Sequence, residues 1–180
     1  MKNLRKCFPL VISCWLIVSS FFSCENTEKK QGISVRFEND TEKWLGESIN
    51  FEKDAKTYKK RFWHYYDSVA AKNDFQKQGK VLSIYGDVLN DAFSSDSLFT
   101  NTVLKYISKA NPKPDSVWIQ LHYQVSLQLF DTNEYQKSRL YAMKGVNFCD
   151  LPQYDDFFAR FKKLIGRGFD AQSKPDSAIS

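Results

Sequence analysis

The sequence predicts an all-α protein built from antiparallel helical hairpins stacked as a short array. Apolar residues recur at spacings of three and four through most of the chain, which is the period of one buried face of an α-helix. No proline occurs from Leu10 to Asn111, and no segment alternates apolar and polar residues as a half-buried strand does. Together these observations favour helices and give no indication of a sheet.

The helices of the first half are predicted at residues 40–51, 54–72, 75–92 and 96–110. The expected buried faces of the last three are Tyr58, Phe62, Tyr65, Tyr66 and Val69, then Val81, Leu82, Tyr85, Val88, Leu89 and Ala92, then Phe99, Val103, Tyr106, Ile107 and Ala110. Between these faces stand Asn73-Asp74 and Ser94-Ser95-Asp96, whose short polar side chains are typical of helix starts.

Asn111-Pro112-Lys113-Pro114 interrupts the helical pattern, and Asp115-Ser116 caps the next segment. Three further helices are predicted, at residues 116–131, 134–149 and 155–170. The first of them places Trp118, Leu121, His122, Val125 and Leu129 on one face. Asp155 and Asp156 begin the last one, because carboxylates favour the positive end of the helix dipole.

Residues 1–23 have the three parts of a secretory signal. Lys2, Arg5 and Lys6 form a basic start, an apolar run extends from Phe8 to Phe22, and Ser23 is a small residue before a polar segment. The run of about fifteen residues is shorter than the roughly 20 that a spanning helix needs. We therefore expect a signal peptide and a mature protein outside the cytoplasm.

Phe21-Phe22-Ser23-Cys24 resembles the end of a bacterial lipoprotein signal, in which the cysteine after the cut receives a lipid. The resemblance implies lipidation of Cys24 and a lipid-anchored protein of the cell envelope, on the periplasmic or outer side of a bacterial membrane. Val11-Ile12-Ser13-Cys14 matches the short pattern better, but lipid at Cys14 would leave an apolar stub beside the anchor. An ordinary signal peptide cut near Ser23 and a retained membrane anchor are the alternatives.

Removal of the signal leaves a nearly neutral chain. Three of the 26 basic residues lie in residues 1–23, so 23 remain against 21 acidic residues, a net charge of +2. This charge gives no electrostatic case for nucleic-acid binding. Cys149 is the one cysteine left besides Cys24, so we expect a domain held by its core and not by disulfides. Residues 24–39 are poor in large apolar residues and are expected to be a flexible tether to a helical domain at residues 40–180.

Residues 115–180 resemble tetratricopeptide repeats, whose two antiparallel helices keep small residues where they cross. The matching small residues are Ser126 in the first helix and Ser138 and Gly145 in the second, and Pro152 stands near the usual breaker. An incomplete second unit matches at Ile165, Gly166, Phe169 and Ala178, with Ala178 placed 40 residues after Ser138 where about 34 is usual. A generic antiparallel helical hairpin with similar spacing is the alternative.

The order of a signal and then helical hairpins is similar to the amino-terminal sensor region of bacterial exported repeat proteins that continue into signalling modules. This implies a protein- or peptide-binding scaffold or sensor, either shortened relative to longer relatives or with an open end that meets another chain. First helices line the concave face of such arrays, so the predicted partner contacts are Gln120, Gln124, Ser126 and Gln128. An incomplete last repeat would leave Leu164, Ile165 and Phe169 poorly covered.

The sequence has no catalytic pattern. His64 and His122 have no paired motif, and His122 lies on a core-facing stripe. We therefore expect no enzyme, metal site or cofactor, and a partner that is a protein or peptide. The alternative function is an accessory glycan-binding lipoprotein of an outer-membrane uptake system, in which Trp44, Trp63 and Tyr66 would stack on sugars.

Overall fold

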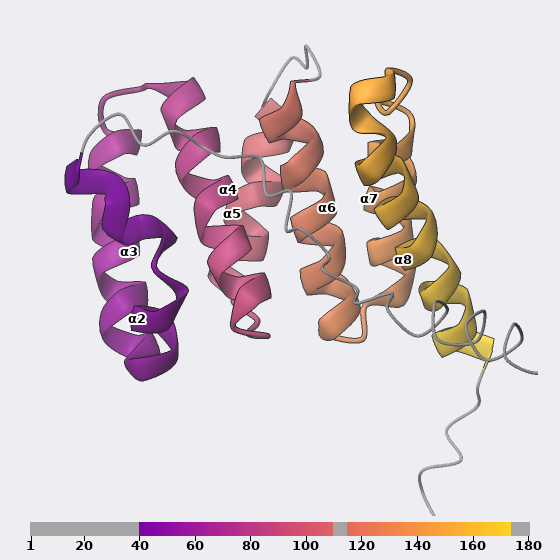
Figure 1. The fold of residues 1–180 in the computed structure, drawn as a ribbon, viewed down its shortest axis with the longest axis horizontal. Helices are drawn as coiled ribbons and strands as arrows, with labels where there is room; N and C mark the ends of the chain where they lie inside the picture. The colour runs from indigo at the N-terminus through magenta and orange to yellow at the C-terminus, as the bar shows by residue number, and fades with distance from the viewer. Residues whose placement is uncertain (1–39, 110–114, 174–180) are drawn as a thin grey trace, which may run out of the picture. The chain divides into compact units, whose positions relative to one another are not determined.

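A computed structural model of the chain describes residues 40–109 and 115–173, and both ranges belong to one compact unit (Figure 1). The described elements are η1 (Asp40–Gly46), α2 (Ser48–Lys53), α3 (Ala55–Ala70), α4 (Phe75–Asp91), α5 (Ser97–Lys109), α6 (Ser116–Asp131), α7 (Tyr135–Val146), η2 (Pro152–Tyr154) and α8 (Asp155–Ser173). None of these residues is in a strand, which confirms the predicted all-α class. No described helix is both long and apolar enough to cross a bilayer.

The predicted boundaries agree with the structure to within a few residues, except at the start. The single helix predicted at residues 40–51 is instead a 3-10 segment, η1, followed by the short helix α2. Leu45 on η1 is 1% exposed and Phe51 on α2 is 3% exposed. On one continuous α-helix these two side chains would point about 120° apart, so the break between the elements lets both enter the core.

Aspartates cap the helices at the predicted places. The Oδ1 atom of Asp74 accepts a hydrogen bond from Lys77 N at 2.9 Å, and that of Asp115 accepts one from Trp118 N at 2.8 Å. Asp96 caps α5 in the same way, accepting from Leu98 N at 3.0 Å. Each carboxylate satisfies a backbone donor that the first helical turn leaves unpaired.

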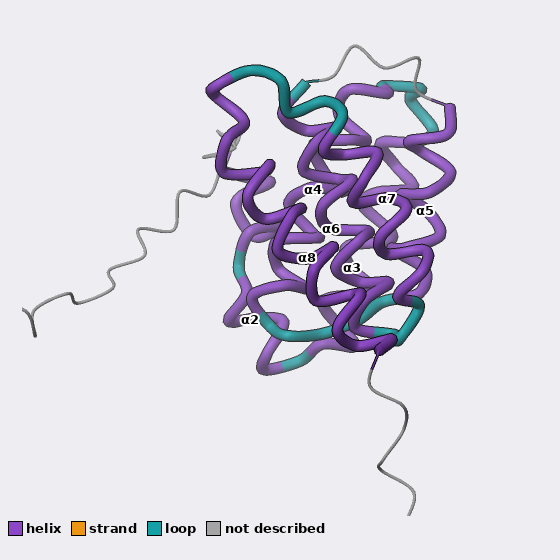
Figure 2. Tube along the Cα trace, turned by 90° about the vertical axis from the view of Figure 1, so that its right-hand side faces the viewer, coloured by secondary structure: helices purple, strands orange, loops and turns teal. Residues whose placement is uncertain are grey.

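The helices form two layers. In the first layer η1 and α2 pack on α4, α4 packs on α6, and α6 packs on α8. In the second layer α3 packs on α2 and α4, α5 on α4 and α6, and α7 on α6 and α8. Figure 1 shows α2 in front of α3 and α8 in front of α7, and Figure 2 shows that short loops join the helices. Each of the first-layer helices α2, α4 and α6 is followed in the chain by a second-layer helix. Among the described residues, no such helix comes after α8.

Helix α6 lies at the centre of this arrangement and contributes to two apolar cores. Leu121 and Val125 belong to the core shared with η1 and α2 to α5. Trp118 and Ile119 belong to a second core, which includes Phe161 of α8. Burial on several sides explains why α6 has no Lys or Arg.

Small residues lie where α7 crosses its neighbours, as predicted. Ser126 of α6 and Ser138 of α7 are both fully buried, and Ser138 Oγ donates a hydrogen bond to Ser126 O at 2.7 Å. Gly145 of α7 faces the ring of Phe161 on α8, so that an added Cβ would lie only 2.6 Å from Phe161 Cε1. The α6 and α7 backbones therefore approach each other closely at the two serines, and Gly145 leaves room on α7 for the Phe161 ring of α8.

One turn recurs after 40 residues. Phe93 follows α4 with a φ of 47°, and Asn133 follows α6 with a φ of 62°. In each turn the next amide donates to the carbonyl of a leucine five residues earlier, at 2.9 Å after α4 and 2.8 Å after α6, as in a Schellman motif. Helices α4 and α6 therefore end in the same way, and α8 takes the next place after them in the first layer.

Candidate functional site

The glutamines predicted as partner contacts are buried between helices. Gln120, Gln124 and Gln128 lie four residues apart on one face of α6, and each is at most 5% exposed. Gln128 closes the turn between α4 and α5, because its Nε2 donates to Ser94 O at 3.1 Å and its Oε1 accepts from Asp96 N at 3.0 Å. This amide therefore satisfies backbone groups that the turn leaves open.

Gln120 and Gln124 hold a carboxylate of α4. Gln120 Nε2 donates to Asp87 Oδ2 at 2.7 Å, and Gln124 Nε2 donates to Asp87 Oδ1 at 2.8 Å and to Ser83 O at 2.7 Å. Burial raises the pKa of Asp87, and the two glutamine hydrogen bonds offset part of that effect. Gly86 leaves room for this arrangement, since an added Cβ would lie 2.7 Å from Gln124 Nε2.

Ser126, the fourth predicted contact, is also enclosed. Its Oγ donates to His122 O at 2.6 Å, and its carbonyl accepts from Ser138. Because α4 and α7 each pack directly on α6, the α6 side chains that face these contacts are removed from the surface. All four residues predicted as partner contacts on a concave surface are therefore buried between helices.

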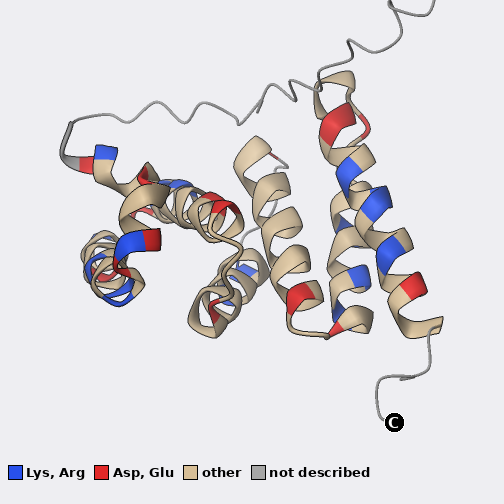
Figure 3. Cartoon of the chain, turned by 60° about the horizontal axis from the view of Figure 1, so that its bottom comes forward, with Lys and Arg blue, Asp and Glu red and all other residues tan. Residues whose placement is uncertain are grey.

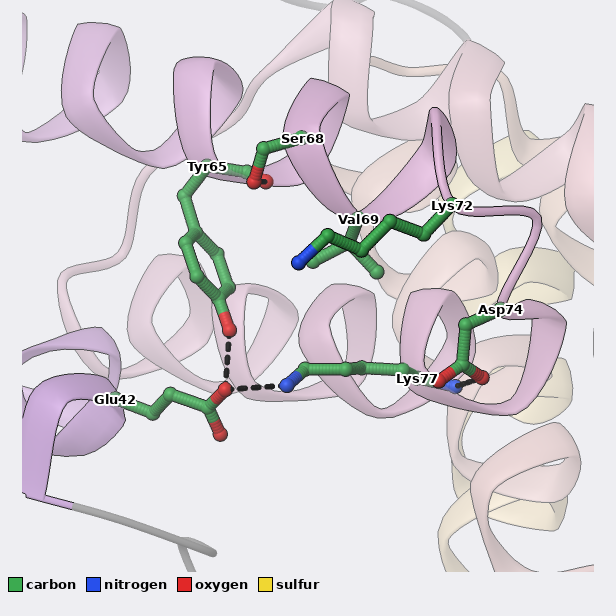
Figure 4. Close-up of a pocket in the computed structure, with 7 residues that line it drawn as sticks. All are labelled: Glu42, Tyr65, Ser68, Val69, Lys72, Asp74 and Lys77. Carbon is green, nitrogen blue, oxygen red and sulfur yellow. Dashed lines mark hydrogen bonds and ion pairs between the residues drawn. The ribbon is translucent and has the colours of Figure 1, made fainter.

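A polar cavity of about 430 Å³ opens between η1, α3 and α4 (Figure 4). It is lined by Glu42, Tyr65, Ser68, Val69, Lys72, Asp74 and Lys77. The Glu42 carboxylate reaches across the cavity, where it accepts a hydrogen bond from Tyr65 OH and pairs with Lys77 Nζ at 2.6 Å. Burial by itself raises the pKa of Glu42, but the hydrogen bonds from Lys77 and Tyr65 bring it below its usual value.

This cluster fastens η1 to the array. Trp44 of η1 packs edge-on against the rings of Tyr58 and Tyr65, at centroid distances of 5.8 and 6.0 Å. Together with the buried Leu45 and the Glu42 carboxylate, these contacts fix the first described element of the chain on α3 and α4. The predicted tether would therefore join the helices at a defined point.

The outer flank of α8 carries apolar residues that the described elements cover only in part. Phe158, Ile165 and Phe169 recur at spacings of seven and four, which places them on one side of the helix. Phe158 is 41% exposed, Phe169 is 58% exposed and Ile165 is half-buried. We call these three residues the α8 stripe. Poor cover is thus confirmed for Phe169, whereas Leu164, on the inner side of α8, is only 3% exposed.

Cations surround the α8 stripe. Lys162 Nζ lies 5.3 Å from the centre of the Phe158 ring, and the guanidinium of Arg139 on α7 lies 4.3 Å from that of Phe169. No acidic residue of the described ranges forms an ion pair with Lys162. Figure 3 shows Lys and Arg gathered on α7 and α8, next to the uncharged length of α6. A cation therefore lies beside each exposed ring of the α8 stripe, although α8 also carries Asp155, Asp156 and Asp170.

Phe158 and Lys162 are absent from the sequence-based prediction, which named Leu164, Ile165 and Phe169 as poorly covered. A signal was available, because Phe158 and Phe169 are eleven residues apart and three helical turns bring them to one side. The core-facing side of α8, with Phe161 and Leu164, already explains the helical spacing of its apolar residues. The sequence therefore gave no reason to look for a second apolar side.

Two of the three aromatic residues of the alternative glycan platform, Trp63 and Tyr66, pack on each other at a centroid distance of 5.6 Å. Trp44 and Trp63 are half-buried, and Arg61 covers the Trp44 ring at 4.0 Å. Trp63 packs instead against Phe62 and Tyr66. Among the described residues, no ring contact joins Trp44 to Trp63 or Tyr66.

Reactive side chains are few in the described ranges. His122 is 2% exposed, its Nδ1 lies 3.0 Å from Trp118 O, and burial lowers its pKa to about 4. Burial raises the pKa of the Cys149 thiol. No group of three or more His, Cys, Asp or Glu residues in residues 40–109 and 115–173 could hold a metal ion. Cys24, the predicted lipidation site, lies outside the described residues.

Comparison of the chain with protein-family models, with curated proteins and with solved structures finds no significant match. The geometry and the surface chemistry of the helical array are therefore the guide to its function.

Proposed function

We propose that the protein is a lipid-anchored scaffold that binds another protein through the α8 stripe. The observation that carries the proposal is the exposure of Phe158 and Phe169 on one side of a helix. Large apolar side chains that are left in contact with water on one side of a helix favour an interaction site. Aromatic residues and Arg are also the types enriched in protein interfaces, and Arg139 lies over Phe169.

The anchor is the second part of the proposal. Lipid on Cys24 and a tether over residues 24–39 would hold the helical array close to a bacterial membrane, with η1 as the point of attachment. Cys24→Ala is expected to abolish acylation and to release the protein from membranes, whereas Cys14→Ala is expected to change neither. Metabolic labelling with an alkyne fatty acid measures this, and label that persists in the Cys24 variant contradicts the anchor.

A photo-crosslinking residue placed in the full chain tests the interface. Positions 158 and 169 report on the α8 stripe, and position 93 is the matched control, because Phe93 is an aromatic residue that is 98% exposed in the turn after α4. We expect a discrete crosslinked protein from positions 158 and 169 and none from position 93. Equal crosslinking at all three positions, or none at 158 and 169, would overturn the proposal.

A further inference from the structure

The geometry of the α8 stripe specifies the kind of partner that fits it, provided that the proposed function of this surface holds. We infer that the partner contributes an amphipathic α-helix with an acidic residue near its middle, and that this helix packs on α8 as α7 packs on α6. Three observations carry the inference: the repeat position of the α8 stripe, an exposed glycine in α8, and the charge of Lys162.

Two residues of the α8 stripe, Ile165 and Phe169, together with the neighbouring Lys162 continue a pattern that is buried on the two preceding first-layer helices. Residues at intervals of 40 form three equivalent sets, which are Leu82, Tyr85 and Leu89 on α4, His122, Val125 and Leu129 on α6, and Lys162, Ile165 and Phe169 on α8. Every member of the first two sets is at most 2% exposed. In the third set Lys162 is exposed and Phe169 is 58% exposed, whereas Ile165 is half-buried against the second core. The face of α8 that remains open is therefore the one that α4 and α6 bury.

A second-layer helix or its cap covers each of the two buried sets. For α4, the ring of Tyr85 stacks on Phe62 of the preceding helix α3 at 3.8 Å and packs on Phe99 of the following helix α5 at 5.7 Å. Its hydroxyl donates to Asp96, the cap of α5, at 2.7 Å. For α6, His122 faces Tyr141 of α7 at 6.4 Å. No helix of the described ranges takes this place on α8. The element that fits the open face is consequently a helix.

Gly166 marks where such a helix would cross α8. It stands 40 residues after Ser126, the point where α7 comes close enough to α6 for Ser138 to bond its carbonyl. An added Cβ at Gly166 would meet no atom within 4 Å, so the described residues supply no packing reason for a glycine here. Glycine weakens a helix interior relative to alanine, but it permits close approach of a second backbone. A partner helix that crosses at Gly166 explains the residue.

Lys162 sets the charge of the partner. It occupies the place of the buried Leu82 and His122, so a helix seated on the stripe would remove the lysine from water. A buried ammonium needs a carboxylate partner. The packing of α7 on α6 shows where that carboxylate would lie. On α7, Tyr141 faces His122 and follows the small residue Ser138 by three positions. Lys162 stands in the place of His122, so the carboxylate should take the place of Tyr141. We expect a small residue in the partner helix and an Asp or Glu three positions later.

The same charge argues against a second copy of this chain as the occupant. The α8 surface of a copy would bring its own Lys162 and Lys163 toward the basic flank, and like charges at an interface oppose association. A partner of opposite charge is thus the better fit to the exposed face.

Selection from a displayed library of single-helix peptides, with the full chain as target, tests the inference. Enriched peptides should carry the small residue and the acid three positions later. Lys162→Glu should weaken their binding by about tenfold or more, and replacement of the acid by Lys in the peptide should restore it. Lys163→Glu is the control, because Lys163 is exposed on another side of α8. Phe169→Ser should abolish binding, with Phe93→Ser as its control.

Three results would overturn the inference. One is enrichment of peptides without an acid, or of none at all. Another is equal loss of binding with Lys162→Glu and Lys163→Glu. The third is binding that appears only after removal of residues 174–180, which would make this chain's own residues the occupant. In the first two cases, crosslinking from positions 158 and 169 would still support the α8 stripe as an interface. The proposed function and the inference about an acidic partner helix can therefore be refuted independently.

Discussion

Gly145→Ala tests how closely α7 and α8 approach. An added Cβ at this position would lie 2.6 and 2.7 Å from Cε1 and Cε2 of the Phe161 ring, which is 0% exposed and has no space into which to move. Overpacking of a filled core costs about 1–3 kcal/mol. Since the residue is near the end of α7, the gain in helix propensity offsets less than the roughly 1 kcal/mol of an interior site. We expect a net loss of about 1–2 kcal/mol in the free energy of unfolding.

Gly166→Ala is the matched control in the neighbouring helix. The added methyl group meets no atom within 4 Å, so only helix propensity acts and stability should rise by about 0.5–1 kcal/mol. Thermal unfolding followed by circular dichroism should separate the two variants, because 1 kcal/mol shifts Tm by about 2–4 °C in a domain of this size. Gly145→Ala that stabilises as much as Gly166→Ala would refute the close α7–α8 contact.

Three further predictions concern other parts of the array. Phe93→Gly should raise stability by about 1 kcal/mol in urea unfolding, because Phe93 is 98% exposed and has a φ of 47°; an unchanged midpoint would contradict the strained turn. Gln128→Ala should cost about 1–3 kcal/mol by leaving Asp96 N unpaired, and binding at the α8 stripe should be unaffected. His122 is neutral in the folded protein because its pKa is about 4 there, against 6.5 when unfolded, so stability should fall as pH drops from 6.5 toward 4. His122→Leu should flatten that part of the stability curve, and an unchanged slope would exclude His122 as its source.

Local patterns along the chain were sufficient to predict the helices. Caps such as Asp74 and Asp115 act on amides three residues away, so the sequence alone determines where α4 and α6 begin. Helical spacing of apolar residues likewise determines which side of each helix avoids water. The small residues Ser138 and Gly145 indicated close crossings before any neighbour was known, and the structure confirms that both are buried.

Tertiary structure alone decided what each side chain meets. Glu42 and Lys77 are 35 residues apart, and no periodic pattern relates an acid on η1 to a lysine on α4. The polar face of α6 misled the sequence-based prediction of the contact site, because amides that look available on a single helix are buried once α4 packs against them, as Gln124 is. Periodicity identifies the apolar side of a helix, but the neighbours decide which sides are covered. That is why the sequence could indicate poor cover at Phe169, whereas the exposure of Phe158 and the burial of Leu164 were decided by the helices that pack on α8.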